Sequence, residues 1–199
     1  MKHLLKRNIL KSSAKTLLLL FFWNVFVLGS LSFKDLPGKK EKTETSRPEE
    51  IINLLFYIQR SINKSAIIYE LNLNEREELN IREPVKIYWK NYATDSSTQA
   101  LNYIQKKYAY GIEMKMINTE KKTFCFNFVS YRKKQIYLIK SPADNKYRAF
   151  CEIAGRFVIL RKIFIQIEGG TFWMPKIKYI EINGNDILKN EEISEKIIP

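Results

Sequence analysis

The feature that most constrains the fold is an alternation of apolar and polar residues that begins near Leu54 and continues almost to the end of the chain. Successive side chains of a β-strand point to opposite faces, so alternation rich in β-branched and aromatic residues is typical of strands. The pattern predicts about nine strands separated by turn residues. These are Leu54–Gln59, Ala66–Leu71, Val85–Tyr92, Glu113–Ile117, Thr123–Tyr131, Gln135–Ile139, Tyr147–Ile153, Arg156–Ile167 and Lys176–Ile182.

The strand predicted at Arg156–Ile167 is apolar on both of its faces, which indicates a central strand covered on two sides. Strict alternation places Phe157, Ile159, Ile163, Ile165 and Ile167 on one face and Val158, Leu160 and Phe164 on the other. Most connections between strands are short, which favours antiparallel pairing of neighbours. The sequence therefore predicts a mainly β domain, a single antiparallel β-sandwich or barrel.

One segment, Ser97–Tyr108, has helical rather than alternating periodicity. Its serine and threonine are candidate N-caps, and Gly111 follows as a stop signal. We expect one amphipathic helix packed on the β domain. A second, shorter helix at Pro48–Leu55 competes with the first strand for the same residues.

The N-terminus resembles an export signal. Five basic residues and no acidic residue precede an apolar run from Leu17 to Leu31, and Ser30 and Ser32 have the spacing of a signal-peptidase site. The run is shorter than the roughly 20 residues of a spanning helix, which favours a cleaved signal. An uncleaved anchor at residues 17–31 and a buried helix remain alternatives. We expect an exported protein of the periplasm or cell envelope, in which only an uncleaved N-terminal segment would contact the membrane.

The chain is expected to have four parts. Residues 1–32 are the signal, 33–48 a polar linker, 49–183 the β domain and 184–199 a C-terminal tail. Cleavage would remove the one histidine of the chain, His3, and with it any histidine-based catalysis or metal ligation. We predict no cofactor and no metal.

The net charge of the mature chain does not by itself identify a class of binding partner. The signal holds five of the 34 basic residues and none of the 21 acidic ones, so the mature chain has 29 basic and 21 acidic residues, a net charge of +8. Clustered lysines attract polyanions, but no nucleic-acid recognition motif is present. We expect no nucleic-acid partner.

Six motifs in order carry a resemblance to a known family. They are LFYIQRS, IIYELN, EPVKIYW, YIQKKYAYG, FVSYRKKQIYLI and GGTFWMPKIKYIEI, between Leu55 and Ile182. Together they resemble the bacterial exported family called domain of unknown function 4833. The resemblance implies one domain and assigns no catalytic residue.

Five residues are candidates for contact with a ligand or partner. Phe172 and Trp173 follow Gly169–Gly170 in a loop that offers flat apolar surface or, alternatively, caps the core. Arg60 shares a strand face with Phe56 and Ile58, and Arg161 shares one with five apolar residues. A guanidinium that points inward from either position would need a carboxylate partner or an anionic ligand. Trp89 shares a strand face with Val85 and Ile87.

The two arginines have an alternative interpretation. Each would lie at a strand end, reach water, or pair with a strand glutamate such as Glu70, Glu152 or Glu181. If instead both arginines converge in a cavity, an amphipathic acid would suit it.

Three function hypotheses follow. The first is a non-enzymatic domain that binds an amphipathic or anionic small molecule, or an envelope protein. The second is a hydrolase with two glutamates. The third is a structural role without a small ligand. Two cysteines in an exported protein suggest a disulfide between Cys125 and Cys151. If their strands flank Gln135–Ile139 as a plain meander, however, their backbones lie about 9 to 10 Å apart, too far for a bridge, which favours buried free thiols.

Overall fold

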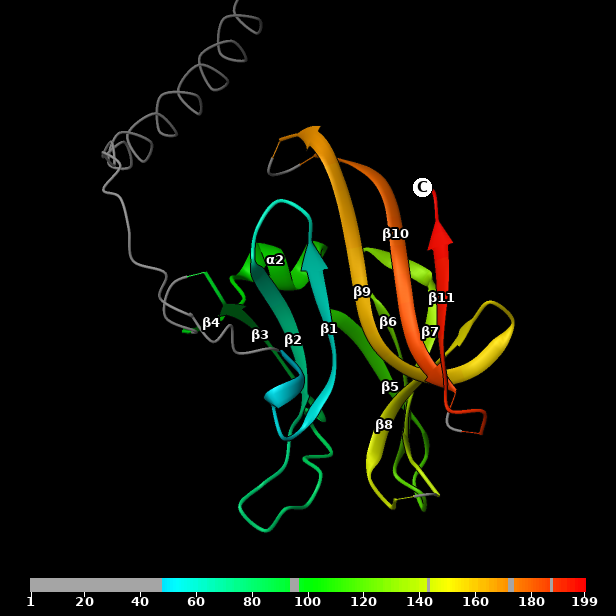
Figure 1. Ribbon diagram of the computed structural model, residues 1–199. Coiled ribbons are helices and arrows are strands. Elements are labelled where there is room, and N and C mark those ends of the chain that lie inside the picture. The colour runs from blue at the N-terminus through cyan, green and yellow to red at the C-terminus, as the bar shows by residue number, and fades with distance from the viewer. Residues whose placement is uncertain (1–47, 94–96, 143, 172–173, 187) are drawn as a thin grey trace, which may run out of the picture. The chain divides into compact units, whose positions relative to one another are not determined.

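The computed structural model describes residues 48–93, 97–142, 144–171, 174–186 and 188–199 (Figure 1). Nearly all regular structure in these residues is β, which confirms the predicted class. The strands are β1 (Leu54–Arg60), β2 (Ser65–Leu71), β3 (Val85–Asn91), β4 (Thr98–Ala100), β5 (Ile112–Asn118), β6 (Thr123–Phe128), β7 (Tyr131–Lys140), β8 (Tyr147–Ile153), β9 (Arg156–Gly170), β10 (Pro175–Asp186) and β11 (Glu191–Ile197). The helices are the 3-10 turn η2 (Pro48–Glu50) and α2 (Tyr103–Tyr108).

All strands join one curled sheet in the order β4-β3-β2-β1-β9-β8-β7-β6-β5, with β10 and β11 added at β9. Neighbours are antiparallel except β1 and β9, which run parallel. Strand β9 pairs with β8 and then β1 along one edge and with β10 along the other, so the sheet branches there. The result is an open half-barrel, and the prediction of a closed sandwich or barrel is wrong (Figure 1).

A β-bulge in β9 corrects the predicted faces of this strand. Leu160 pairs with Gly184 of β10 and Lys162 with Asn183, so Arg161 has no opposite residue. A bulge inserts one residue and reverses the alternation beyond it. Leu160 and Ile163 therefore both point into the core, and Arg161 is exposed.

Gly184 allows β9 and β10 to approach closely at this bulge. A Cβ on Gly184 would lie 2.6 Å from the carbonyl oxygen of Ile159 and 2.7 Å from Cδ1 of Ile153. Only glycine fits there, because real Cβ atoms do not come so close to other heavy atoms.

The core lies inside the curl and is centred on stacked aromatic rings. Phe56 stacks on Tyr69 with ring centroids 4.4 Å apart, and Phe128 meets both rings edge-on. The Tyr69 hydroxyl donates a hydrogen bond of 2.7 Å to the carbonyl oxygen of Tyr110. Burial raises the pKa of Tyr69 well above its ordinary value, so this phenol acts as a donor.

Helix α2 is shorter than predicted and starts later. Residues Thr98–Ala100 pair with β3 as an edge strand, so neither Ser97 nor Thr98 caps the helix. Asn102 is the N-cap, and its side chain and that of Gln105 form a reciprocal capping box. Gly111 follows the helix for a steric reason, since a Cβ there would lie 1.8 Å from the carbonyl oxygen of Lys106. The second helix expected at Pro48–Leu55 is the single turn η2, because β1 takes the residues from Leu54.

The segment 184–199, expected to be a tail, forms the end of β10 and the strand β11. Its burial alternates, with Ile193, Glu195 and Ile197 half-buried between exposed residues. Three glutamates in seven residues concealed this pattern, since charge runs are more typical of solvated tails.

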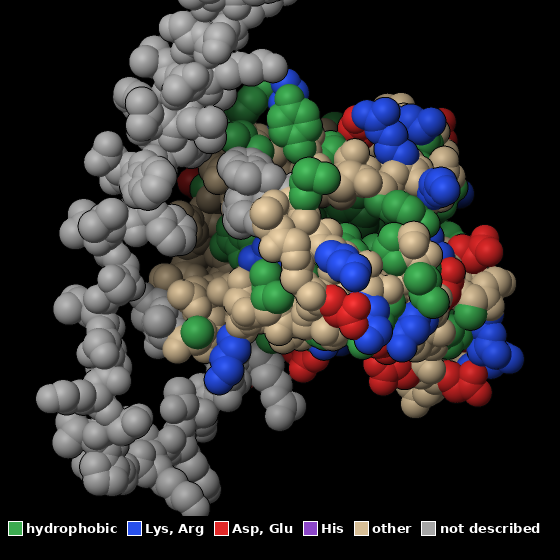
Figure 2. Space-filling model, turned by 90° about the horizontal axis from the view of Figure 1, so that it is seen from above, with side chains coloured by type: hydrophobic (Ala, Val, Ile, Leu, Met, Phe, Trp, Pro, Cys, Tyr) green, Lys and Arg blue, Asp and Glu red, His purple; other side chains and the backbone are tan. Residues whose placement is uncertain are grey.

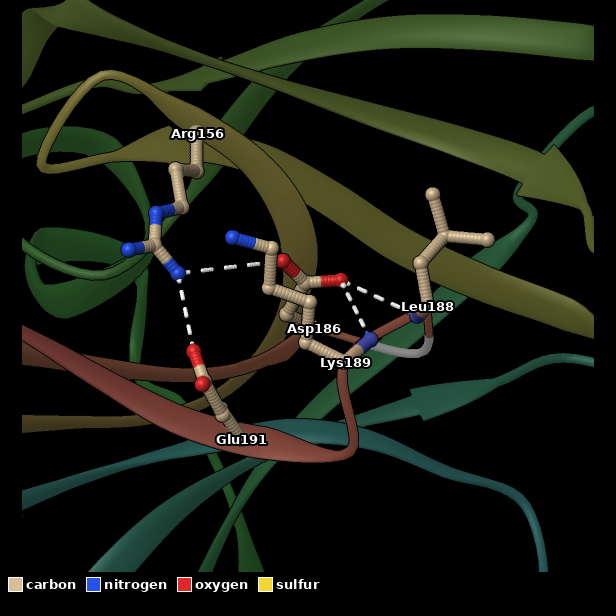
Figure 3. Close-up of polar contacts among 5 residues, drawn as sticks. All are labelled: Arg156, Asp186, Leu188, Lys189 and Glu191. Atoms are coloured by element: carbon tan, nitrogen blue, oxygen red, sulfur yellow. Dashed lines mark hydrogen bonds and ion pairs between the residues drawn. The ribbon is translucent and has the colours of Figure 1, made fainter.

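Polar contacts fix the turn between β10 and β11 (Figure 3). Oδ1 of Asp186 accepts from the backbone N–H of Leu188 at 3.0 Å and of Lys189 at 3.3 Å, an arrangement that shapes the turn. Arg156, after the β8–β9 turn, donates to Glu191 at 3.0 Å and lies 3.9 Å from Asp186. These contacts tie the last hairpin to the β8–β9 hairpin.

The two cysteines lie on the predicted meander. Cys125 of β6 pairs with Tyr137 of β7, and Ile136 of β7 pairs with Cys151 of β8. Two strand spacings therefore separate the thiols, and both are free and buried.

The predicted signal and most of the linker, residues 1–47, lie outside the described part of the chain. Within the described part, no helix has the length and apolar character needed to cross a membrane.

Candidate functional site

A cavity of about 650 Å³ lies against the inner face of the curled sheet. Strands β1, β9 and β10, helix α2, and parts of β7, β8 and β11 line it. Seen from above, hydrophobic side chains gather in a hollow at the top of the domain (Figure 2). Eleven isoleucines contribute to the lining: Ile58, Ile62, Ile104, Ile136, Ile163, Ile165, Ile167, Ile177, Ile180, Ile182 and Ile197.

Strand register arranges part of this lining in two rows across β1, β9, β10 and β11. Residues paired on neighbouring strands present their side chains to the same face. The first row is Arg60, Ile165, Ile180 and Ile197. The second row is Ile58, Ile163 and Ile182, and it continues to Glu195, which pairs with Ile182 but is not itself among the described lining residues. Each apolar row therefore has one ionic residue at one end, and these ends lie on opposite sides of the cavity.

Arg60, a predicted contact residue, lies at the end of β1 in the cavity lining. Its Nη1 donates to the hydroxyl of Tyr110 at 3.2 Å, and its guanidinium carbon lies 4.7 Å from the ring centroid of Trp89. The Asn63 amide, oriented to satisfy its hydrogen bonds, accepts from Nη2 at 2.7 Å. Every one of these partners is neutral.

Trp89, on β3, is the second predicted residue at this place. Its Nε1 donates to Oε1 of Gln105 at 3.3 Å, and its ring meets that of Tyr110 edge-on at 5.5 Å. The structure thus brings Arg60 and Trp89 together, and each is hydrogen-bonded to a residue in or just after α2.

The other predicted residues do not join this group. Arg161 is exposed on the bulge of β9, where it lines a small separate depression with Tyr57 and Glu192. Arg60 and Arg161 therefore do not converge. Phe172 and Trp173 lie outside the described residues.

A half-buried ion pair lies on the opposite side of the cavity, where Lys134 is part of the lining. Nζ of Lys134 on β7 lies 2.8 Å from Oε2 of Glu195 on β11, and these side chains are 18% and 31% exposed. The same carboxylate accepts from the backbone N–H of Ala154 at 3.1 Å. The hydrogen bond from Lys134 lowers the pKa of Glu195, with a smaller contribution from Ala154. This pair balances its own charge and links β11 to β7 and to the β8–β9 turn.

Cys151 also lines the cavity, but its thiol is unsuited to nucleophilic chemistry. Burial raises its pKa to about 11, and nearby Lys134 only partly opposes that effect. Reactivity requires the thiolate, which this environment disfavours.

The glutamates weighed for a two-carboxylate mechanism lie apart. Glu70 of β2 accepts from the hydroxyl of Tyr88, Glu181 of β10 accepts from Ser194, and Glu152 of β8 is exposed. No Asp or Glu is among the described residues that line the cavity. The described residues also contain no group of three His, Cys, Asp or Glu side chains able to hold a metal ion.

A family model called domain of unknown function, DUF4833, matches residues 56–196. The chain belongs to the DUF4833 family. The match confirms the resemblance seen in the six motifs, and it includes β11, which the sequence analysis had left outside the domain. No curated protein and no solved structure matches the chain.

Sequence reasoning missed three residues that shape the site of this DUF4833 domain. Tyr110 holds Arg60 through its hydroxyl, and Lys134 and Glu195 form an ion pair on the far side of the cavity. Their partners are 50 and 61 residues away along the chain, so no local spacing indicates them.

Proposed function

We propose that this DUF4833 domain is an exported, non-enzymatic binding protein that holds an amphipathic small molecule in its isoleucine-lined cavity. The observation that carries the proposal is the cavity itself, with eleven isoleucines and one arginine whose described partners are all neutral. Export is supported by the pattern of the first 32 residues.

The size and chemistry of the cavity fit a small ligand. Ligand pockets enclose about 300–1,000 Å³ and combine an apolar lining with a few polar groups, and the cavity of about 650 Å³ has both properties. Filling it with an alkyl chain would remove apolar surface from water, worth about 0.8 kcal/mol per buried CH₂ before the costs of association. A purely structural domain has no need of such an internal surface.

The cavity can be tested with a neutral fluorescent probe, N-phenyl-1-naphthylamine, whose emission rises in apolar surroundings. Ile180 lies in the middle of the first row, so Ile180→Trp adds volume where the probe would lie. Ile117 on β5 is 49% exposed and is not in the described lining, so Ile117→Trp is the matched control.

We expect the wild type and Ile117→Trp to bind the probe with the same affinity, and Ile180→Trp to bind it at least tenfold more weakly. Equal binding by all three proteins, with native circular dichroism spectra, would refute the cavity as the binding site. Intact mass measurement of the protein purified from its own organism tests export, since the proposal expects loss of the first 32 or so residues.

A further inference from the structure

Arg60 differs from Lys134, the other cation among the described residues that line the cavity. Lys134 is paired with Glu195, whereas no carboxylate in the described residues lies within ion-pair distance of Arg60. A guanidinium keeps its charge in proteins, so the Arg60 side of the cavity carries uncompensated positive charge.

The surroundings of Arg60 also leave hydrogen-bonding capacity unused. A guanidinium has five N–H donors. The Tyr110 hydroxyl and the Asn63 amide accept two hydrogen bonds from Nη1 and Nη2, and the buried Nε has no acceptor among the described residues. Burial of a charged group without full hydrogen bonding is unfavourable, and an anion beside the guanidinium would offset its unpaired charge.

The guanidinium is also held in position. The Trp89 ring covers it at 4.7 Å, and the Tyr110 hydroxyl fixes Nη1. The carbonyl oxygen of Tyr110 is in turn held by the buried hydroxyl of Tyr69. A planar donor group fixed in this way suits the two oxygens of a carboxylate or phosphate.

We infer that Arg60 is the headgroup site of the cavity and selects single-chain amphiphiles with an anionic headgroup, a carboxylate or a phosphate. The alkyl chain then lies along the isoleucine row that begins beside Arg60, formed by Ile165, Ile180 and Ile197. This inference rests on the proposed function, because it assigns the polar end of a ligand whose apolar end fills the same cavity.

The test compares dodecanoate with dodecanol, which share a chain and differ in headgroup charge, by displacement of the neutral probe at pH 7.5. Dodecyl phosphate in a third arm distinguishes a carboxylate from a phosphate preference. Three variants are measured: Arg60→Gln, Arg60→Lys, and the exposed Arg161→Gln, which removes the same charge away from the cavity.

A hydrogen bond to a charged group contributes about 1.5–3 kcal/mol, so we expect the wild type to prefer an anion over dodecanol by roughly 10- to 150-fold. Arg60→Gln should abolish the preference while dodecanol affinity stays within about twofold. Arg60→Lys keeps the charge but loses the planar guanidinium, so it should retain part of the preference for an anion. Arg161→Gln should retain the full preference. The dodecanol measurement also shows whether a variant retains its cavity.

Two kinds of failure are distinguishable. If anions and dodecanol bind the wild type equally, or if Arg60→Gln and Arg60→Lys both keep the full preference, Arg60 is not the headgroup site and the proposed function stands. If neither the probe nor any amphiphile binds the wild type, the proposed function itself fails.

Discussion

The hydrogen bond from Tyr69 to Tyr110 links the core to the site, and its removal gives a sharp prediction. Tyr69→Phe keeps the ring that stacks on Phe56 and deletes only the hydroxyl. The Tyr69 side chain is fully buried, so the substitution leaves the Tyr110 carbonyl without its 2.7 Å donor. An unsatisfied buried acceptor costs about 1–3 kcal/mol, and we expect the free energy of unfolding to fall by that amount.

Tyr92 provides a matched control with the opposite expectation. Its hydroxyl is buried and has no hydrogen-bond partner in the described part of the chain, and burial raises its pKa to about 12. Tyr92→Phe therefore removes a hydroxyl that loses its hydrogen bonds to water on folding and forms none with the described residues in return. The free energy of unfolding should stay unchanged or rise by up to about 1 kcal/mol.

Urea denaturation measures both variants. With a slope of about 2 kcal/mol/M, the midpoint of Tyr69→Phe should fall by roughly 0.5–1.5 M at constant slope, and that of Tyr92→Phe should not fall. Equal losses of stability in the two variants would refute this assignment of the hydrogen bonds. In Tyr69→Phe, dodecanoate affinity should also fall more than dodecanol affinity, because Tyr110 positions Arg60.

Further predictions concern the far side of the cavity, the end of α2 and the thiols. The folded state lowers the pKa of Glu195, so its stabilising contribution is present above its ordinary value near 4.5 and is lost as the pH falls through the depressed value. In Lys134→Met, the free energy of unfolding measured with urea should fall less between about pH 7 and pH 3 than it does in the wild type. An unchanged pH dependence would contradict the ion pair. Gly111→Ala should destabilise the fold by about 1–3 kcal/mol in thermal denaturation, because its Cβ would lie 1.8 Å from a backbone oxygen, and full stability would disprove that packing. Cys151 and Cys125 should react with iodoacetamide at pH 7.5 only after unfolding, as mass spectrometry would reveal, and rapid labelling of the native protein would contradict their burial.

The period-two pattern predicted the strands well because most of them have one buried face. All nine predicted strands are present, with ends that differ by a few residues. Alternation failed at Arg161, where the bulge depends on pairing with a glycine of β10, a partner that the sequence of β9 does not contain. It also failed to indicate β4 and β11, since β4 has only three residues and the glutamates of β11 are typical of a solvated segment.

Only those features of the candidate site that depend on neighbouring residues within one strand were predictable from the sequence. Arg60 attracted attention because it shares a strand face with the apolar Phe56 and Ile58, and it does line the cavity. Its pairing with Ile165 depends on a parallel contact between strands more than a hundred residues apart, and no sequence spacing predicts that register. Strict alternation places Arg161 on the same face as Ile163, which left open that it converges with Arg60, and the one-residue bulge at Arg161 rules this out.

A crystal structure of the domain with dodecanoate tests the central claim most directly. The account predicts the carboxylate within hydrogen-bond distance of the Arg60 guanidinium, with the alkyl chain running past Ile165 and Ile180. A chain bound elsewhere on the domain, or a chain inside the cavity whose carboxylate lies at Lys134, would contradict it.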